Sequence, residues 1–186
     1  MLKAKPFIKW VGGKSQLIEQ LEAQLPADFD NWKNVTYIEP FVGGGAMLFY
    51  MLQRYPHIRR AIINDINPDL CTCYRTVRDM PEQLIKALYE VERTYLSLKT
   101  EEDRKSYFMS VREHYNEKKL NAIENTTLFF FLNRTCFNGL YRVNKKGLFN
   151  VPFGKYANPT ICDPGTIRKD SELLQQVEIL NEDFEV

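Results

Sequence analysis

The strongest constraint in this chain of 186 residues is a short apolar stretch that runs directly into a cluster of glycines. Residues 35–39 are rich in β-branched and aromatic side chains, which predicts a strand. Pro40 and the glycines at 43–45 predict a tight turn, and residues 46–54 are good helix formers. A second apolar stretch at 61–64 predicts another strand. This order is typical of a parallel sheet with crossover helices, so we expect an α/β fold.

The glycine cluster also has the composition of a nucleotide site. Gly43 and Gly45 allow a ligand to approach the backbone closely, and the helix that follows offers free N–H groups in its first turn. Asp65 comes 20 residues after Gly45, where its carboxylate can accept hydrogen bonds from ribose hydroxyls. The alternatives are a purely structural turn at the glycines and, at Asp65, a turn residue beside Asn64 and Asn67.

Two common nucleotide motifs do not fit. The dinucleotide pattern G-x-G-x-x-G fails because residues 46–49 contain no further glycine. Residues 13–15 (Gly-Lys-Ser) match the end of a P-loop, but Ile8 stands where its first glycine is required. A nucleoside ligand without phosphates therefore fits better than NAD or ATP.

Helices are expected in much of the remaining chain, because apolar residues recur every three or four positions. Thr100 and Asp103 form the pattern of a capping box, which marks a helix start. The predicted helices cover residues 14–25, 82–98, 100–117, 122–133 and 171–176, the last capped by Ser171, and a third strand covers 177–180. We expect an α/β domain of residues 1–74 and 156–186, interrupted by a helical insert at 75–155.

The formal net charge of +1 is unevenly distributed. Residues 125–162 hold five basic residues and no Asp or Glu, which leaves 20 basic and 24 acidic residues in the remainder. A basic segment on an otherwise acidic chain predicts a localised contact with an anionic partner. The alternative is a solvated loop that happens to carry several lysines.

A hairpin is predicted within this basic segment. Residues 140–143 and 148–151 have the pattern of two strands, and the Asn-Lys-Lys-Gly sequence at 144–147 is typical of a turn. Aromatic residues are interspersed with the basic ones, which favours nucleic acid over a generic anion. They are Phe137, Tyr141, Phe149, Phe153 and Tyr156.

Four blocks, in the same order, resemble the Dam-type DNA adenine-N6 methyltransferases. They are Lys-Trp-Val-Gly-Gly-Lys at 9–14, Glu-Pro-Phe-Val-Gly-Gly-Gly at 39–45, Asn-Asp-Ile-Asn at 64–67, and the region 131–154. The resemblance covers essentially the whole chain. It implies a Rossmann-like methyltransferase fold with an inserted helical DNA-recognition domain that carries a β-hairpin. The implied activity is site-specific methyl transfer from S-adenosylmethionine to N6 of adenine in double-stranded DNA.

The resemblance also implies roles for individual residues. The implied cofactor-binding residues are Trp10, Lys14, Phe41, Gly43, Gly45, Asp65, Asp183 and Phe184. The implied DNA-binding residues are Arg134, Phe137, Asn138, Arg142, Lys145, Lys146 and Lys155. Asp65 would hold the ribose and Asp183 the cofactor's adenine, although Asp183 as a solvated acid stays open. Phe137 would enter the base stack, and Lys145 and Lys146 would contact phosphates.

The family's catalytic tetrapeptide, Asp/Asn-Pro-Pro-Tyr/Phe, is absent from these 186 residues. In the family it accepts the hydrogens of the adenine amine and stacks on the flipped base, without a metal. Asp163-Pro164-Gly165 is the nearest string and has the pattern of a turn. We therefore assign no catalytic residue and expect little or no turnover from this chain alone. A truncated methyltransferase, one half of a split enzyme, and a non-catalytic binding fragment stay open, and a small-molecule methyltransferase would leave the basic hairpin unexplained.

Other signals exclude several classes of protein. No apolar run approaches the roughly 18 residues of a membrane span. The four cysteines do not form a disulfide framework, so we expect a reduced cytoplasmic protein. Cys71 and Cys73 have the wrong spacing for zinc, and we expect no metal. A sheet lacking some of the family's strands would leave an edge and an apolar face exposed, so we expect self-association or a complementing C-terminal fragment.

Overall fold

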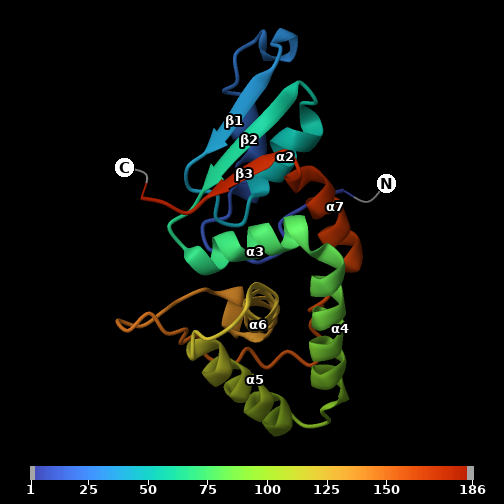
Figure 1. The fold of residues 1–186 in the computed structure, drawn as a ribbon, viewed down its shortest axis with the longest axis vertical. Helices are drawn as coiled ribbons and strands as arrows, with labels where there is room; N and C mark the ends of the chain where they lie inside the picture. Colours follow the sequence, from blue (N-terminus) through green and yellow to red (C-terminus); the bar gives the residue numbers. More distant parts are fainter. Residues whose placement is uncertain (1–2, 184–186) are drawn as a thin grey trace.

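The computed structural model describes residues 3–183 and has a sheet at one end and a group of helices at the other (Figure 1). The strands are β1 (Val35–Glu39), β2 (Ile58–Asn64) and β3 (Val177–Leu180). They lie in the order β1-β2-β3 and both pairings are parallel, with Glu39 opposite Ile63 and Ile63 opposite Ile179. The predicted α/β class and parallel sheet are confirmed. The carboxyl ends of all three strands therefore lie on the same side of the sheet.

Helices and single 3₁₀ turns form the rest of the described chain. The helices are α1 (Ile18–Glu22), α2 (Ala46–Arg54), α3 (Pro68–Asp79), α4 (Pro81–Ser97), α5 (Glu101–Asn116), α6 (Ala122–Thr135) and α7 (Pro164–Leu174). The 3₁₀ turns are Lys14–Gln16, Phe29–Asn31 and Phe137–Gly139. No helix within residues 3–183 has the length and apolar character that crossing a bilayer requires.

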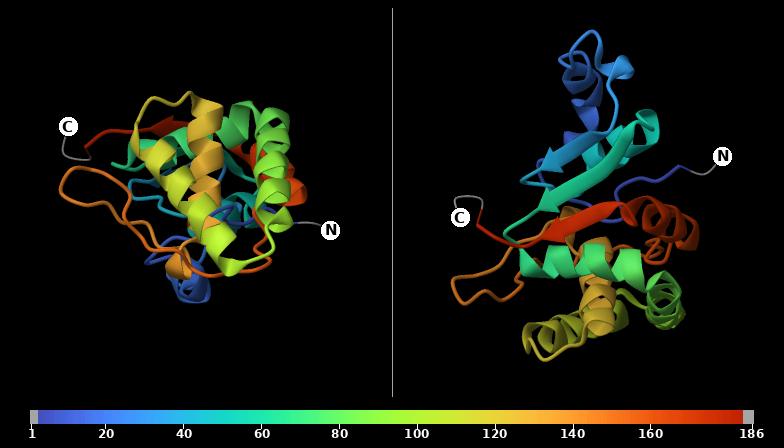
Figure 2. Two further views of the ribbon diagram at one scale, coloured as in Figure 1. Left: turned by 90° about the horizontal axis from the view of Figure 1, so that it is seen from below. Right: turned by 45° about the horizontal axis from the view of Figure 1, so that its top comes forward.

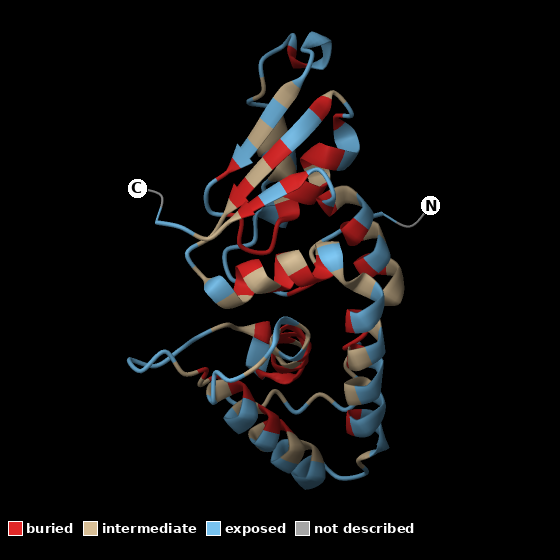
Figure 3. Cartoon of the chain, viewed as in Figure 1, coloured by how far each residue is buried: buried red, intermediate tan, exposed pale blue. Residues whose placement is uncertain are grey.

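Buried and exposed residues alternate along the strands of the sheet, as the colours in Figure 3 show. Side chains alternate across a strand, and here Ala61, Ile63, Val177 and Ile179 are buried on one face. On the other face Thr36, Arg60 and Glu178 are exposed, and Ile38 keeps 62% of its surface accessible. The exposed residues of this face are mostly polar, with Ile38 as an apolar one among them. The expected apolar face and the association through it stay predictions.

Helix α6 is the centre of the helical part. It contacts α3, α4 and α5, which surround it in the view from below (Figure 2). Phe129, Phe130 and Phe131 are all buried, so the aromatic run is core, as the sequence indicated. Phe131 meets the rings of Tyr95 and Tyr107 edge to face, at centroid distances of 5.5 and 5.4 Å. These contacts hold α6 against α4 and α5.

Several predicted elements are confirmed with small shifts in their ends. Thr100 caps α5 by accepting the N–H of Asp103 at 3.0 Å. The predicted hairpin forms its turn, in which Gly147 donates to the Asn144 carbonyl and Asn144 donates to the Leu148 carbonyl. Its strands do not form a continuous ladder: the 140–151 stretch holds a single antiparallel bridge, between Val143 and Phe149.

Three expectations about helices were wrong or incomplete. The predicted helix at 14–25 is broken into a 3₁₀ turn and the short α1, because Leu17 from its apolar face stays 46% exposed and gains little from packing. Ser171 does not cap a helix, because α7 begins seven residues earlier, at Pro164. Asp163 caps α7 by accepting the N–H of Thr166, and the Ser171 hydroxyl donates to the Arg78 carbonyl. Helix α3 was not predicted, and it runs through the proposed boundary at residue 75.

The N-terminal segment, residues 4–9, connects the two ends of the molecule through side chains that bind its backbone. Gln53 of α2 bonds both the N–H and the carbonyl of Ala4, each at 2.9 Å. Asn133 of α6 does the same at Lys9, at 2.8 Å. Asp170 of α7 accepts the N–H of Lys5 at 3.0 Å. Because these partners come from three helices, the segment that leads to Trp10 has a defined path.

Asp170 makes the stability of this arrangement depend on pH. Burial, opposed by the Lys5 N–H bond, raises the pKa of Asp170 from 3.8 to about 8. The folded state therefore favours the protonated acid, and this stabilisation is complete below the unfolded pKa and lost as the pH rises toward 8. We expect the free energy of unfolding of the wild type to fall by about 4 kcal/mol between pH 5 and 8, relative to Asp170→Asn.

Urea unfolding followed by circular dichroism across this pH range measures the difference. The exposed residue Asp28, changed to Asn, serves as the matched control and should leave the pH profile of the wild type unaltered. Parallel profiles for the wild type and Asp170→Asn would contradict the prediction.

Candidate functional site

A cavity of about 150 Å³ lies where β1 and β2 end. It brings together five of the predicted cofactor residues from three separate blocks of sequence: Trp10, Lys14, Phe41, Gly43 and Asp65. The strand ends of an open α/β sheet are the usual place for a ligand. Gly45, also predicted, does not line the cavity. It lies in the same loop and packs against Tyr74 and Phe49.

The glycines of the loop are required by the protein's own packing. Gly43 and Gly45 have φ values of +50° and +74°, which other residues adopt only with strain. A β-carbon on Gly43 would lie 2.7 Å from Cδ1 of Trp10, and one on Gly45 would overlap the hydroxyl of Tyr74. Tyr74 is fully buried on α3 and donates to the Gly43 carbonyl at 2.9 Å. The loop is thereby held between Trp10 and α3.

Asp65 joins this loop to the start of α3. One carboxylate oxygen accepts the N–H of Gly43 and the other accepts the N–H of Asn67, both at 3.0 Å. Asn67 in turn caps α3 by accepting the N–H groups of Asp69 and Leu70. A carboxylate oxygen can accept two hydrogen bonds, so Asp65 keeps capacity for hydroxyl donors from a ligand.

Glu39 is a site residue that the sequence reasoning did not single out. It is the last residue of β1, it is buried, and it accepts the Tyr37 hydroxyl at 2.9 Å. Burial raises the pKa of Glu39, and the charge of Lys14 partly offsets that effect. The sequence contained a signal for Glu39: a carboxylate that ends a strand directly before the glycine turn lies at the carboxyl ends of the strands, where ligands bind.

A second cavity, of about 190 Å³, adjoins the first and shares Glu39 with it. Asp183 lines this second cavity together with Ile38, Pro40 and Leu180. The structure thus divides the predicted cofactor residues between two neighbouring hollows at the same sheet edge. Phe184, the last of the predicted set, lies outside the described residues.

The basic segment meets the first cavity through aromatic stacking. The ring of Tyr141 stacks on Trp10, with centroids 5.4 Å apart and an angle of 23° between the planes. Tyr141 also stacks on Phe129 of α6, at 5.3 Å and 27°. One wall of the cavity is therefore continuous with the base of the hairpin.

Most of the predicted DNA-binding residues are exposed around this hairpin. Phe137 and Asn138 lie on the 3₁₀ turn after α6, and Asn138 has a φ of +54°. Lys145 and Lys146 lie in the exposed turn. Arg142 is exposed and held by Asn150, whose side-chain oxygen and carbonyl accept its guanidinium at 2.8 and 3.1 Å.

Two further predicted DNA residues, Arg134 and Lys155, also have partners within the protein. Arg134 is largely buried and donates to the carbonyl of Phe7 at 2.7 Å, and burial lowers its pKa. Its guanidinium therefore holds the N-terminal segment. Lys155 is exposed, but its ammonium pairs with Glu101 of α5 at 2.9 Å. Of the two, only Lys155 has a side chain that is free to exchange its partner for a phosphate, because its ion pair faces solvent.

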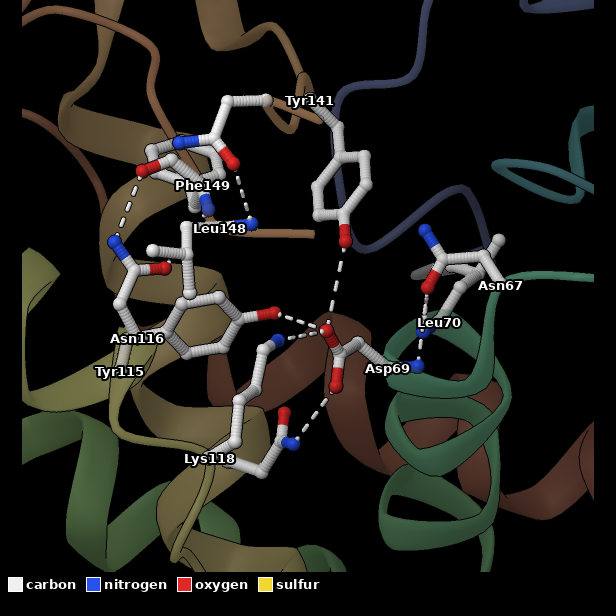
Figure 4. Close-up of polar contacts among 11 residues, drawn as sticks. Asn67, Asp69, Leu70, Tyr115, Asn116, Lys118, Tyr141, Leu148 and Phe149 are labelled. Atoms are coloured by element: carbon white, nitrogen blue, oxygen red, sulfur yellow. Dashed lines mark hydrogen bonds and ion pairs between the residues drawn. The ribbon is translucent and has the colours of Figure 1, made fainter. Parts of the chain in front are cut away.

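Asp69, in the first turn of α3, collects hydrogen bonds from the helical part (Figure 4). It accepts from Tyr115 at 2.6 Å, Lys118 at 2.8 Å and Asn125 at 3.0 Å. Burial alone would raise the pKa of Asp69, but these donors outweigh it and hold the pKa below its usual value. Nothing in the sequence marked Asp69, because its partners lie 46 to 56 positions away.

Comparison with known proteins identifies the family. Over residues 10–186 the chain matches the family described as D12 class N6 adenine-specific DNA methyltransferase. The chain belongs to this family. The resemblance found in the sequence is thus confirmed, and membership implies a methyl donor as cofactor. Within residues 3–183, no three His, Cys, Asp or Glu side chains come together as ligands for a metal ion.

Individual relatives agree with this assignment. The D12-class chain is 47% identical over its whole length to the type II methyltransferase M.MjaIII of Methanocaldococcus jannaschii and covers 64% of it. It is 36% identical to M1.LlaDCHI of Lactococcus lactis, over 99% of this chain and 60% of that one. It is 33% identical to the DNA adenine methylase of Escherichia coli K12, over 86% of this chain and 51% of the relative. The chain thus spans half to two thirds of these relatives.

The glycine loop allows a test with a matched control. Gly45 and Gly147 have nearly the same φ, +74° and +73°, but a β-carbon meets no atom within 4 Å at Gly147. We expect Gly147→Ala to lower the free energy of unfolding by about 1 kcal/mol, the cost of the left-handed conformation. Gly45→Ala should cost about 1–3 kcal/mol more because of the clash with Tyr74. Urea titrations compare the two, and equal costs would contradict the packing role of Gly45.

Proposed function

We propose that this chain provides the cofactor-binding and DNA-contacting parts of an S-adenosylmethionine-dependent, site-specific methyltransferase that modifies N6 of adenine in double-stranded DNA. Residues 1–74 and 156–186 would bind the cofactor, and 75–155 would contact the DNA. The observation that carries the proposal is the convergence of Trp10, Lys14, Phe41, Gly43 and Asp65 on one cavity whose wall continues into the basic hairpin.

The residues around the cavity suit S-adenosylmethionine chemically. The cofactor carries two positive groups, the sulfonium and the ammonium, which the carboxylates of Glu39 and Asp65 favour electrostatically. Lys14 suits the carboxylate of its methionine part, and Asp65 can accept from its ribose. When bound, the cofactor supplies an electrophilic methyl group. The chain's own task is to hold and orient it.

The exposed residues around the hairpin suit duplex DNA. Arg142 and Asn138 carry the groups that read guanine and adenine edges, and Phe137 offers a ring for stacking. Lys145 and Lys146 would contact phosphates, which position the protein without reading sequence. Lys155 could join them by leaving Glu101. We assign Arg134 to the N-terminal segment instead, because its guanidinium binds the Phe7 carbonyl.

The proposal includes no catalytic residue. The adenine amine is a weak nucleophile, and a hydrogen-bond acceptor at that amine is needed to activate it. The 186 residues contain no Asp/Asn-Pro-Pro-Tyr/Phe sequence, and little turnover by this chain alone stays a prediction. A polypeptide that supplies such a tetrapeptide would complete the enzyme. A fragment that binds cofactor and DNA without catalysis is the alternative.

Cofactor binding can be tested at Asp65. We expect Asp65→Ala to weaken S-adenosylmethionine binding by about 1–3 kcal/mol, because a charged acceptor is lost. Isothermal titration calorimetry of the chain measures the affinity. The change also releases the N–H of Gly43, so a melting curve without cofactor should be recorded to measure the stability of the loop itself. The exposed Asp28→Ala is the control, and an affinity unchanged by Asp65→Ala would contradict the assignment.

DNA binding can be tested at the hairpin turn. We expect a duplex to bind with an affinity that falls with salt, and Lys145→Ala with Lys146→Ala to reduce the slope of log K against log salt by about 2. Fluorescence anisotropy of a labelled duplex measures the slope. A matched double variant, Lys86→Ala with Lys105→Ala on exposed faces of α4 and α5, should leave it unchanged. If no duplex binds, a small-molecule methyltransferase becomes the better interpretation.

A further inference from the structure

We propose that Tyr141 is a positioning residue through which cofactor binding and DNA binding strengthen each other. It belongs to neither set of predicted contacts, yet it stacks on Trp10, which lines the cofactor cavity, and it stands at the base of the hairpin. The inference rests on the proposed function, because it concerns two ligands of the same site. It adds a residue and a property, cooperativity, that the separate binding sites do not require.

The first half of the argument is the contact of Tyr141 with the cavity wall. Its ring stacks on Trp10 at 5.4 Å, and Trp10 lies tightly against the glycine loop, where even one β-carbon on Gly43 would come within 2.7 Å of the indole. Trp10 and Gly43 both line the cavity. Trp10 therefore cannot shift without changing the space that the cofactor occupies.

The second half is the contact of Tyr141 with the opposite side of the site. In Figure 4 its hydroxyl points at Asp69, at an oxygen–oxygen distance of 3.5 Å. Asp69 is fixed by Tyr115, Lys118 and Asn125, and it lies in the turn that Asn67 caps. Asn67 also donates to Asp65. Tyr141 thus reaches both Trp10 and the first turn of α3, next to the predicted ribose acceptor.

The hairpin continues directly from this residue. Arg142 follows Tyr141 in the chain and is clamped to Asn150 on the other arm, so the two arms move together at their base. Tyr141 is half-buried, whereas the turn at residues 144–147 is exposed. A movement of the exposed turn would therefore be passed along the arms to the ring of Tyr141. A duplex that fixes the arms would also fix the ring against Trp10. Coupling of two ligands is reciprocal, so the cofactor would tighten DNA binding by the same factor.

The experiment measures the affinity for S-adenosylmethionine by calorimetry, with and without a saturating mixed-sequence duplex at low salt. For the wild type we expect the duplex to tighten cofactor binding at least about fivefold. Tyr141→Leu removes the ring and should reduce this factor to about one, whereas Tyr141→Phe keeps the ring and should retain most of it. The control is Tyr107→Leu, the same change at a half-buried tyrosine of α5 whose ring meets Phe131 of α6. It should retain the full factor.

The outcomes separate this inference from the proposed function. A wild type that binds both ligands without mutual enhancement, or a Tyr141→Leu chain that keeps the enhancement, overturns the role of Tyr141 and leaves the proposed function intact. A wild type that binds neither ligand overturns both. If Tyr141 had a merely structural role, its substitution would change the affinity for each ligand alone. It would leave unchanged the factor by which the duplex tightens cofactor binding.

A second measurement does not depend on whether Tyr141→Leu folds. The chain has two tryptophans, so Trp32→Phe leaves Trp10 as the only one and keeps an aromatic ring at position 32, where Trp32 packs on Phe29. We expect a duplex added without cofactor to change the emission of Trp10 in this background. Tyr141→Phe should keep that change. Emission that responds to the cofactor and not to a bound duplex overturns the inference.

Discussion

Asp65 accepts the N–H groups of Gly43 and Asn67, so one carboxylate ties the loop that follows β1 to the loop that follows β2. The candidate site depends on this junction. The glycine loop needs a partner because its positive φ values turn its backbone groups away from the regular pairing of a strand. Asn67 needs a fixed position because it caps α3. Since both loops lie at the strand ends, their junction also forms the floor of the cavity.

Helix α3 extends the effect of that junction to the rest of the molecule. It contacts β3 and α7 on the sheet side and α6 on the helical side. Its first turn carries Asp69, which gathers donors from α5 and from the N-terminal end of α6, and its middle carries Tyr74, which holds Gly43. The candidate cofactor cavity and the helical part are therefore not independent units joined by a linker. A single helix supports both, which is the structural basis for expecting their ligands to be coupled.

The elements that the sequence predicted well are those with a strong local signal. The glycine turn requires positive φ, and Thr100 with Asp103 specifies a helix start within four residues. The failures have the opposite cause. The apolar pattern at 14–25 needs a surface to pack on and finds little, so the helix breaks at Leu17. Helix α3 was not predicted, although its start carries a local signal, with Asn67 as the cap and Pro68 in the first turn.

The sequence by itself determined the α/β class, the glycine loop, the carboxylate that follows β2 and the family, because each of these is carried by residues close together in the chain. Only the tertiary structure decided which side chains face one another. It brought Glu39 into the cavity, turned Arg134 inward to the Phe7 carbonyl, and stacked Tyr141 on Trp10. These contacts join positions more than 120 residues apart in two of the three cases, and no local pattern encodes them. They depend on how α3 and α6 pack together, which is a property of the whole fold.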